Sequence, residues 1–389
     1  MKKLFVFTLI LFFTFKVFAQ TQKTDVLVIG NNNAAVSAAI QAVQSDVKVI
    51  LLLQAGGFDI EPVVKDINSG IQLNFVNKLA TKENFNKQEA NAALTQMTDS
   101  LKKLTVIKNV SWIKAGKSGN GWSLTLSNGQ SIKAKILINT ADIKLNNTLK
   151  INAAESQIWQ QVDYLNNIYR TSVAGGKTMN NSNITQASLY RFLIPQQESF
   201  LWLTDNSMLS GQAAGAIAAY SAFFNVKLSL VDVKKIQGEL IKFKLNLIPF
   251  ADIQTSNPNW AAIQKTGVMG IIKGQVQNDQ LYFMPEKEIT TEEIKQPLKD
   301  HFYKAQIWFD DHTKPSLSLN DALDLVCYTG NKSKETTEKE VQKKWKTTYA
   351  FKTDFDLNKI VTRQELAVLL QDYTSPFLVN TDKEGNIQR

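Results

Sequence analysis

The chain has 389 residues, with 44 Lys and Arg against 35 Asp and Glu, two histidines and one cysteine. Its 44% hydrophobic and 20% charged residues are typical of a globular protein with a substantial core. The lone Cys327 excludes an intramolecular disulfide and a thiolate zinc cage, and two histidines exclude a three-histidine metal site within one chain.

The first twenty residues have the layout of a secretory signal peptide. Two lysines form a basic start, an apolar run covers residues 4–15, and the stretch ends in the small residue Ala19. A membrane anchor needs about 20 apolar residues, and Lys16 interrupts this run too early. We therefore expect export, cleavage after Ala19, and a periplasmic or extracellular location.

The formal net charge of +9 raises the question of nucleic-acid binding. Only four basic residues are arginine, the residue whose planar side chain suits phosphate and base contacts. No basic stripe with interleaved aromatic residues occurs. We interpret the lysines as a solvated surface and expect no nucleic-acid partner.

Residues 25–53 have the pattern of a βαβ unit. An apolar run ends in Gly30, small residues fill 31–44, and a second apolar run covers 47–53. Two buried strands joined by a helix predict a parallel α/β sheet. A βαβ unit without any ligand has the same pattern, so this alternative stays open.

The opening resembles the FAD-binding domain of exported FAD-dependent oxidoreductases with a glutathione-reductase-like Rossmann fold. Their G-x-G-x-x-G fingerprint corresponds to 30–35, where asparagine replaces the second glycine and alanine the third. Glutamine replaces the acid that ends the second strand. The resemblance implies that the turn faces the FAD pyrophosphate and that the strand end faces the ribose: Gly30, Asn32, Asn33, Ala35 and Gln54.

A second segment is similar to the same family. Residues 121–129 alternate polar and apolar side chains before an Asn-Gly turn, which predicts a hairpin. Residues 134–142 resemble the family's strand A-x-x-V-I-x-A-T-G-D, with Ala141 in place of the glycine. The resemblance implies a β-meander inserted into the Rossmann domain.

The third segment combines a strand at 201–205 with a small-residue helix starting at Gly211. Residues 211–219 resemble the family's G-Q-A-A-G-x-A-A-A signature, whose helix N-terminus points at the flavin. Such a terminus stabilises the anion of a reduced flavin. A helix used only for packing is the alternative. The resemblance implies cofactor contacts from Asp205, Gly211, Gln212 and Ala213, and a position for Arg170 on the substrate side.

The C-terminal part contains an internal repeat. In 283–293 and 355–365, threonine lies seven residues after phenylalanine and glutamate ten residues after it. Threonine three residues before glutamate is a capping box, which predicts helices at 291–299 and 363–372. The pattern resembles S-layer-homology-like repeats, which implies packing or attachment to the cell envelope.

Two segments carry residue types that could bind a metal ion. Asp354, Asp356, Asn358 and Glu365 match EF-hand positions, but Lys359 replaces the turn glycine. We favour the repeat interpretation there. The cluster 310–312 follows an apolar run, and we favour a structural role for it. The sequence therefore predicts no metal site.

These observations predict an α/β protein with a Rossmann-like FAD-binding domain, an inserted β-meander and a small, mainly helical C-terminal domain. The primary hypothesis is an exported oxidoreductase that moves a hydride or electrons between an unknown small organic substrate and FAD, with weakened FAD binding. The alternative is a catalytically silent relative acting as a binding or surface-attachment module. The sequence indicates no catalytic residue, since the chemistry would belong to the cofactor. The predicted segments are a signal peptide at 1–19, the FAD-binding domain at 20–249, the helical domain at 250–375 and a tail at 376–389.

Overall fold

The computed structural model describes residues 21–63, 69–80, 85–140, 142–151, 158–178 and 181–388. Residues 1–20 lie outside these stretches, so the signal peptide stays a prediction. Within them, no helix has the length and apolar character needed to cross a membrane.

The N-terminal βαβ unit forms as predicted. Strand β1 covers Thr21–Ile29, helix α1 covers Asn33–Gln44 and strand β2 covers Val49–Leu53. β1 and β2 are parallel, and every residue of β2 is buried. A continuous apolar strand is expected where a parallel sheet is covered on both faces.

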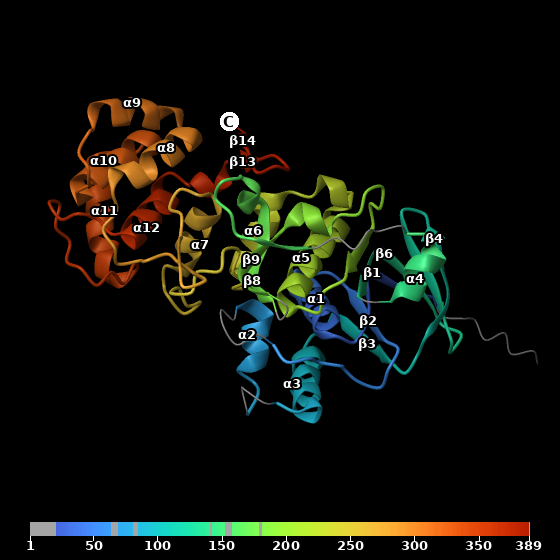
Figure 1. Cartoon of the computed structure of the whole chain (residues 1–389). Coiled ribbons are helices and arrows are strands. Elements are labelled where there is room, and N and C mark those ends of the chain that lie inside the picture. Colours follow the sequence, from blue (N-terminus) through green and yellow to red (C-terminus); the bar gives the residue numbers. More distant parts are fainter. Residues whose placement is uncertain are drawn as a thin grey trace, which may run out of the picture.

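Five further strands extend this unit into one sheet: β3 (Leu104–Lys108), β4 (Trp112–Ser118), β5 (Gly121–Leu126), β6 (Ser131–Thr140) and β10 (Phe200–Leu203). The order is β3-β2-β1-β6-β5-β4, with β10 also pairing with β6 (Figure 1). β3, β2, β1, β6 and β10 pair in parallel, whereas β6, β5 and β4 form the antiparallel meander. The predicted α/β class with a Rossmann-like sheet and an inserted meander is confirmed.

Strand β6 changes its neighbour halfway along its length. Residues 131–134 pair with β5, whereas residues 137–140 pair with β10. Lys135 and Ile136 lie between the two partners, so the sheet splits at this point.

One face of the sheet is covered by α1 and by helix α5, which covers Met208–Phe224. A Cβ atom at Gly211 would lie 2.2 Å from the carbonyl oxygen of Ala34, and one at Gly215 would lie 2.3 Å from that of Ala38. The two helix backbones therefore touch, and glycine is the residue that permits this approach. The small residues of both helices serve this packing.

Smaller elements complete the N-terminal half. The three-stranded antiparallel sheet has the order β7-β9-β8. The bounds are α2 (Gly70–Val76), α3 (Lys87–Asp99), α4 (Ile143–Leu149), β7 (Trp159–Gln161), η1 (Ile168–Thr171), β8 (Ser172–Thr178), β9 (Asn181–Ser188), η2 (Leu189–Phe192), η3 (Leu228–Leu230) and α6 (Val233–Lys242). Helix α6 leads into the C-terminal region.

The C-terminal region contains six helices, which we group in chain order as three pairs: α7 (Trp260–Val268) with α8 (Thr291–His301), α9 (Tyr303–Asp311) with α10 (Leu319–Gly330), and α11 (Lys334–Thr347) with α12 (Arg363–Tyr373). The first helix of each pair carries a buried tryptophan: Trp260, Trp308 and Trp345. The second helix of each pair starts at a capping box. A hairpin, β11 (Gln275–Gln277) and β12 (Gln280–Tyr282), lies within the first pair.

Isolated β-bridges join the three pairs to one another. Glu288 bridges to Thr362, Thr290 to Ser316, and Ser318 to Ile360, so each loop contacts the other two. The two predicted capping-box helices are confirmed, and the structure adds a third copy between them. The repeat pattern found within the sequence does not include this copy, because its capping box uses serine and aspartate in place of threonine and glutamate.

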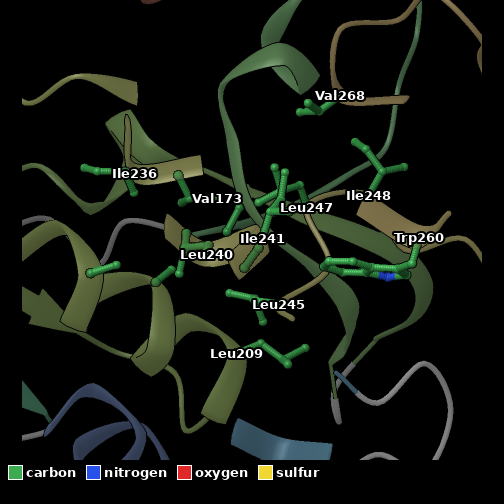
Figure 2. Close-up of a cluster of buried hydrophobic side chains, with 14 of the residues drawn as sticks. Val173, Leu209, Ile236, Leu240, Ile241, Leu245, Leu247, Ile248, Trp260 and Val268 are labelled. Atoms are coloured by element: carbon green, nitrogen blue, oxygen red, sulfur yellow. The ribbon is translucent and has the colours of Figure 1, made fainter. Parts of the chain in front are cut away.

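Hydrophobic contacts continue across the boundary predicted at residue 250. Figure 2 shows Leu247 and Ile248 in one cluster with Trp260 and Val268, and all four side chains are buried. The side chain of Gln264 in α7 also accepts the backbone N–H group of Leu247 at 2.8 Å. The division into two domains stays a prediction, because one core cluster includes residues from both sides.

The tail also packs against the N-terminal half. It contains η4 (Pro376–Leu378), β13 (Asn380–Thr381) and β14 (Ile387–Gln388). A Cβ atom at Gly385 would lie 1.9 Å from the carbonyl oxygen of Asn167, which places the tail directly on the segment before η1. The C-terminus thus contributes to the contact between the two halves.

Candidate functional site

The turn after β1 requires glycine. Gly30 has a φ of +140°, and a Cβ atom there would lie 1.9 Å from the Oγ1 atom of Thr140. The Thr140 hydroxyl donates to the carbonyl oxygen of Ile29 at 3.0 Å. The turn and the end of β6 are therefore in direct contact, as expected at the carboxyl edge of a Rossmann-like sheet.

The N-terminus of α1 is the place where a dinucleotide pyrophosphate binds in Rossmann folds. Here two of its amide groups have side-chain partners within the protein. The N–H group of Asn33 donates to Oδ1 of Asn206 at 2.9 Å, and that of Ala35 donates to Oδ1 of Asn32 at 2.9 Å. Two side-chain oxygens thus accept hydrogen bonds from amide groups that could otherwise donate to a phosphate.

Residues 57–61, which we call the strap, pass over this helix end. The Asn33 side chain donates to the Glu61 carbonyl oxygen and accepts the Glu61 N–H group, both at 3.0 Å. The N–H group of Asp59 donates to the Asn31 carbonyl oxygen at 2.8 Å. Asn33, which the sequence suggested as a pyrophosphate contact, therefore holds a piece of the chain itself, whereas the side chain of Asn32 caps the helix.

The strap is anchored from its other side as well. Phe58 and Ile60 are buried, with 4% and 3% of their surfaces exposed. The side chain of Asn91 in α3 accepts the Phe58 N–H group at 2.7 Å and donates to the Phe58 carbonyl oxygen at 2.8 Å. Removing the strap would disrupt both the core and these hydrogen bonds.

Helix α5 begins earlier than the sequence suggested. We expected its N-terminus at Gly211, but the helix starts at Met208, because the Ser207 side chain caps it by accepting the N–H group of Leu209 at 3.2 Å. Gly211 and Ala213 are buried one turn inside the helix. The helix end itself is not formed by the residues expected to face the flavin.

Gln212 is held entirely by protein groups. Its Nε2 atom donates to Oε1 of Gln41 at 2.8 Å, and its Oε1 atom accepts the N–H group of Ile71 at 2.9 Å. The residue is fully buried between α1, α5 and α2. A flavin contact from Gly211, Gln212 or Ala213 stays a prediction that these packing contacts do not favour.

Asp205 closes the turn between β10 and α5. One of its carboxylate oxygens accepts the Trp159 indole N–H at 2.6 Å, and the Ser210 hydroxyl donates to the carboxylate at 2.8 Å. Burial raises the pKa of Asp205 above its usual value, although both hydrogen bonds oppose this shift. The side chain stabilises the turn that presents Asn206 to α1.

Arg170, expected on the substrate side, connects the two halves of the molecule. It is buried, and its Nε atom donates to the Met269 carbonyl oxygen at 3.0 Å. Its Nη1 atom donates to Oδ1 of Asn167 at 2.7 Å and to the Gly385 carbonyl oxygen at 3.2 Å. These contacts use three donor positions on uncharged oxygens of the protein, so a substrate role stays a prediction.

An open hollow of about 510 Å³ lies at the carboxyl ends of β1, β2 and β6, beside Gly30, Gln54 and Lys144. Gln54 donates from Nε2 to Oδ2 of Asp142 at 2.9 Å, and the Trp112 indole N–H donates to the same oxygen at 2.8 Å. Asp142 thus supplies a carboxylate beside Gln54, which stands at the position of the acid in the fingerprint that the sequence resembles. Ala141 lies outside the described residues.

The residues present do not fit a complete FAD molecule. The hollow has a volume within the range of small-ligand sites. The amide groups next to it, which a pyrophosphate needs, are bonded to Asn32 and Asn206, and the strap passes over them. Sequence reasoning missed Asn206, Asp142 and the strap, since only the fold brings them to this edge.

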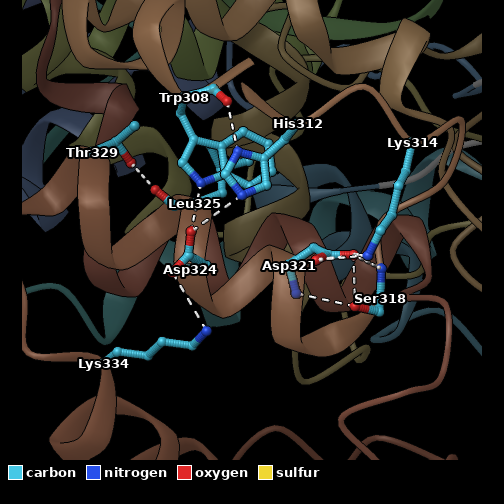
Figure 3. A network of polar contacts seen from close by, with 9 residues as sticks. All are labelled: Trp308, His312, Lys314, Ser318, Asp321, Asp324, Leu325, Thr329 and Lys334. Carbon is cyan, nitrogen blue, oxygen red and sulfur yellow. Dashed lines mark hydrogen bonds and ion pairs between the residues drawn. The ribbon is translucent and has the colours of Figure 1, made fainter. Parts of the chain in front are cut away.

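Among the described residues no group of three His, Cys, Asp or Glu side chains could hold a metal ion. The Glu365 carboxylate, which would be the last EF-hand ligand, pairs with Lys359 and accepts the N–H group of its own cap residue Thr362. Figure 3 shows the surroundings of His312, whose ring stacks on Trp308 with centroids 3.8 Å apart. The Trp308 indole donates to Asp324 at 2.7 Å, which gives His312 a structural setting.

No family model and no curated protein sequence matches the chain. Solved structures match part of it. Thioredoxin reductase of T. acidophilum is 19% identical over 31% of this chain and 35% of its own, with a TM-score of 0.22. Bacillithiol disulfide reductase from Staphylococcus aureus is 14% identical over 31% of this chain and 38% of its own, with a TM-score of 0.23. A steroid monooxygenase bound to NADP is 15% identical over 30% of this chain and 26% of its own, with a TM-score of 0.26. The chain thus spans little more than a third of their length at most.

Proposed function

We propose that this chain is a catalytically silent relative of the FAD-dependent oxidoreductases, in which the Rossmann-like region is a scaffold for binding or attachment. The observation that carries this proposal is the pairing of the α1 amide groups with Asn32 and Asn206 beneath the strap. The protein has replaced the pyrophosphate with its own polar groups. The sequence resemblance to the family accounts for the fold, and the asparagines account for the loss of the cofactor.

The energy needed to open this site supports the proposal. Withdrawing the strap exposes Phe58 and Ile60, at about 1.5–3 kcal/mol for each side chain. Each hydrogen bond that is lost contributes about 0.5–1.5 kcal/mol more. Even a penalty of about 4 kcal/mol, below the sum of these contributions, would weaken binding about a thousandfold.

One observation favours a second candidate, an FAD-dependent oxidoreductase that binds its cofactor in a rearranged form. The hollow beside Gly30 remains open, and the Asp142 carboxylate lies at the edge where ribose hydroxyl groups bind in this family. In such an enzyme the flavin would supply the redox chemistry. Asp142, Gln54 and Lys144 would hold the nucleoside half.

The visible absorption spectrum of the purified protein separates these two candidates. We expect a colourless protein and no saturable quenching of FAD fluorescence on titration. A yellow protein with stoichiometric flavin would overturn the proposal and establish the second candidate.

Two sets of variants test the role of the strap directly. Asn33→Ala with Asn206→Ala frees the first α1 amide and releases the strap, and we expect measurable FAD binding to appear. The substitutions suggested by the family fingerprint, Asn32→Gly with Gln54→Glu, leave the strap in place and put a second carboxylate next to Asp142. We expect this pair to gain less affinity. Equal gains from both pairs would contradict a closing role for the strap.

Export and envelope attachment complete the proposal. The support for export is the signal-like stretch 1–19, and the support for attachment is the array of three helix pairs. N-terminal sequencing of exported material should begin at Gln20. Recovery of a chain with intact Met1 in the membrane fraction would contradict cleavage.

A further inference from the structure

A second hollow, of about 830 Å³, lies at the opposite edge of the sheet from the one described above. It forms at the amino ends of β1 and β6, where β6 leaves β5 and pairs with β10. Its volume falls within the range of small-ligand sites. Six lysines line it: Lys23, Lys48, Lys117, Lys133, Lys135 and Lys227.

The two acidic residues of this hollow are already engaged by the protein. Asp25 pairs with Nζ of Lys135 at 2.8 Å and accepts the backbone N–H group of Lys48 at 3.0 Å. Glu198 accepts the N–H group of Ser229 at 3.0 Å and its hydroxyl at 2.8 Å. In the part of the chain that the structure describes, no carboxylate lies within ion-pair distance of the other five lysines.

Lys117 is the lysine that most needs a counter-ion. Its ammonium nitrogen lies 3.8 Å from the ring centroid of the buried Trp122 and 3.4 Å from Oγ of Ser199. Partial loss of hydration lowers the pKa of Lys117. A cation that has lost part of its hydration is stabilised by a nearby anion more strongly than a fully hydrated one.

Two more lysines are held next to each other by the sheet. Lys23 of β1 and Lys133 of β6 are direct partners in the parallel ladder. Residues at one register position in adjacent strands project on the same face, so the two ammonium groups share one side of the sheet. Neighbouring like charges destabilise a sheet, and an anion between them removes the repulsion.

We propose that this hollow binds a small polyanion, a molecule that carries two or more phosphate or carboxylate groups and contacts Lys117 and Lys133. The volume and the unpaired lysines carry the inference. It is independent of the flavin question, because the hollow lies at the other end of the strands. Lysine is suited to such ligands as a point charge that can donate to several oxygens.

The test is calorimetric titration of the purified protein with tripolyphosphate and, separately, with citrate. We expect saturable binding of at least one, and the preferred probe identifies phosphate or carboxylate as the recognised group. Affinity should fall as the salt concentration rises, because the contacts are ionic.

Variants with matched charge separate a site from a general effect of positive charge. Lys117→Gln with Lys133→Gln should weaken binding about tenfold or more, since two charge-assisted contacts are lost. Lys102→Gln with Lys343→Gln removes the same charge from exposed positions outside the hollow and should leave the affinity within about twofold. All four lysines are exposed, so folding should be preserved. The absence of saturable binding to the unaltered protein, or equal weakening in both pairs, overturns the proposal.

Discussion

Single side chains decide which groups bond to the N-terminus of α1 at the carboxyl edge of the sheet. Asn33 bonds to the strap through its side chain and to Asn206 through its N–H group. Asn32 caps the same helix. A neutral amide oxygen satisfies a helix N-terminus without adding charge, so the helix remains stable without a phosphate. Asn32, at the position of the second glycine in the fingerprint that the sequence resembles, therefore satisfies an amide group of the helix from within the chain.

Asp205 gives the first prediction. Burial raises the pKa of this carboxyl group in the folded protein. Ionisation of the group therefore destabilises the folded state as the pH rises above the pKa that the group has in the unfolded chain. Asp205→Asn keeps an oxygen that can accept from Trp159 and carries no charge. At pH 8 we expect the free energy of unfolding of this variant to be at least that of the unaltered protein. At pH 4 we expect the variant to compare less favourably with the unaltered protein than it does at pH 8. Asp205→Ala should lose about 1–3 kcal/mol by leaving the indole N–H unpaired.

Urea unfolding at the two pH values measures both effects. A loss of stability in Asp205→Asn at pH 8 as large as that in Asp205→Ala would show that the charge itself stabilises the turn. Circular dichroism before unfolding checks that each variant retains its helices.

At the scale of elements, close packing of α1 against α5 explains a sequence that the family resemblance connects with flavin. The glycines of α5 lie against carbonyl oxygens of α1. Such contact buries both helices and leaves little room for a cofactor ring between them. One small-residue pattern thus serves either helix packing or cofactor approach, and the neighbouring side chains decide which.

Gly211→Ala tests this packing. The new Cβ atom would lie 2.2 Å from the Ala34 carbonyl oxygen, so the helices must separate. We expect a loss of about 1–3 kcal/mol or more in the free energy of unfolding. The matched control is Gly238→Ala inside α6, where no described atom lies within 4 Å of the new Cβ. Alanine favours helix there and should stabilise by about 0.5–1 kcal/mol. Equal effects at the two sites would contradict the packing interpretation.

Arg363 gives a prediction for the helix pairs. Its guanidinium pairs with Glu293 of α8 and donates to the carbonyl oxygens of Phe283 and Lys273, so it joins the third pair to the first. The side chain is 1% exposed. Arg363→Ala leaves Glu293 without its partner and should cost about 3–5 kcal/mol.

Chemical unfolding of three variants measures this contribution. Arg363→Lys should recover only part of the loss, because an ammonium group cannot reproduce the planar fork that reaches three oxygens. Lys343→Ala on the exposed face of α11 is the control and should change stability by about 0.5 kcal/mol or less. Full recovery with lysine would mean that charge alone, and not the fork, holds the pairs together.

At the scale of the whole molecule, the two halves are joined by buried polar contacts as well as by the core. Arg170 reaches both Met269 and the tail, and Gln237 donates to the carbonyl oxygens of Arg170 and Ser172. Lys234 lies in the same junction, where its Nζ atom contacts Sδ of Met269 at 3.0 Å and lies 5.5 Å from the ring centroid of Phe377. The junction therefore buries positive charge.

Lys234 makes the junction sensitive to pH. Burial, together with the charge of Arg170, lowers its pKa to about 7, while Asp232 acts in the opposite direction. The unfolded chain keeps the proton up to about pH 10.4. Between these values the unfolded state binds more protons, so this group makes folding more favourable as the pH rises, by at most about 1.4 kcal/mol per pH unit.

Lys234→Met should remove this part of the pH dependence. We expect the variant to be more stable than the unaltered protein at pH 6 and to lose that advantage by pH 9, as measured by urea unfolding. Lys235→Met, on the exposed side of the same helix, should show no such change. A stability difference that is the same at both pH values would show that burial of the charge does not control the junction.

The sequence by itself determined the local structure of this protein. Apolar runs, small-residue periodicity and capping boxes predicted β1, α1, β2, the meander and the starts of α8 and α12, because each depends on residues close together in the chain. The α/β class followed from these elements. The third helix pair escaped notice because its cap uses different residues, and the start of α5 was misplaced because Ser207 was not recognised as its cap.

The tertiary structure alone decided what the candidate site contains. Asn33 and Asn206 are separated by 173 residues, and Asn33 and Glu61 by 28, yet each pair is hydrogen-bonded. The alternation and spacing of side chains report which face of an element is buried, and they carry no information on which distant polar group will meet a free amide. That choice depends on the path of the loops between elements, which is set by packing of residues such as Phe58 and Ile60 into the common core. The sequence therefore predicted a Rossmann-like fold, and the long-range contacts of that fold pair two amide groups of α1 and hold the strap over the helix end.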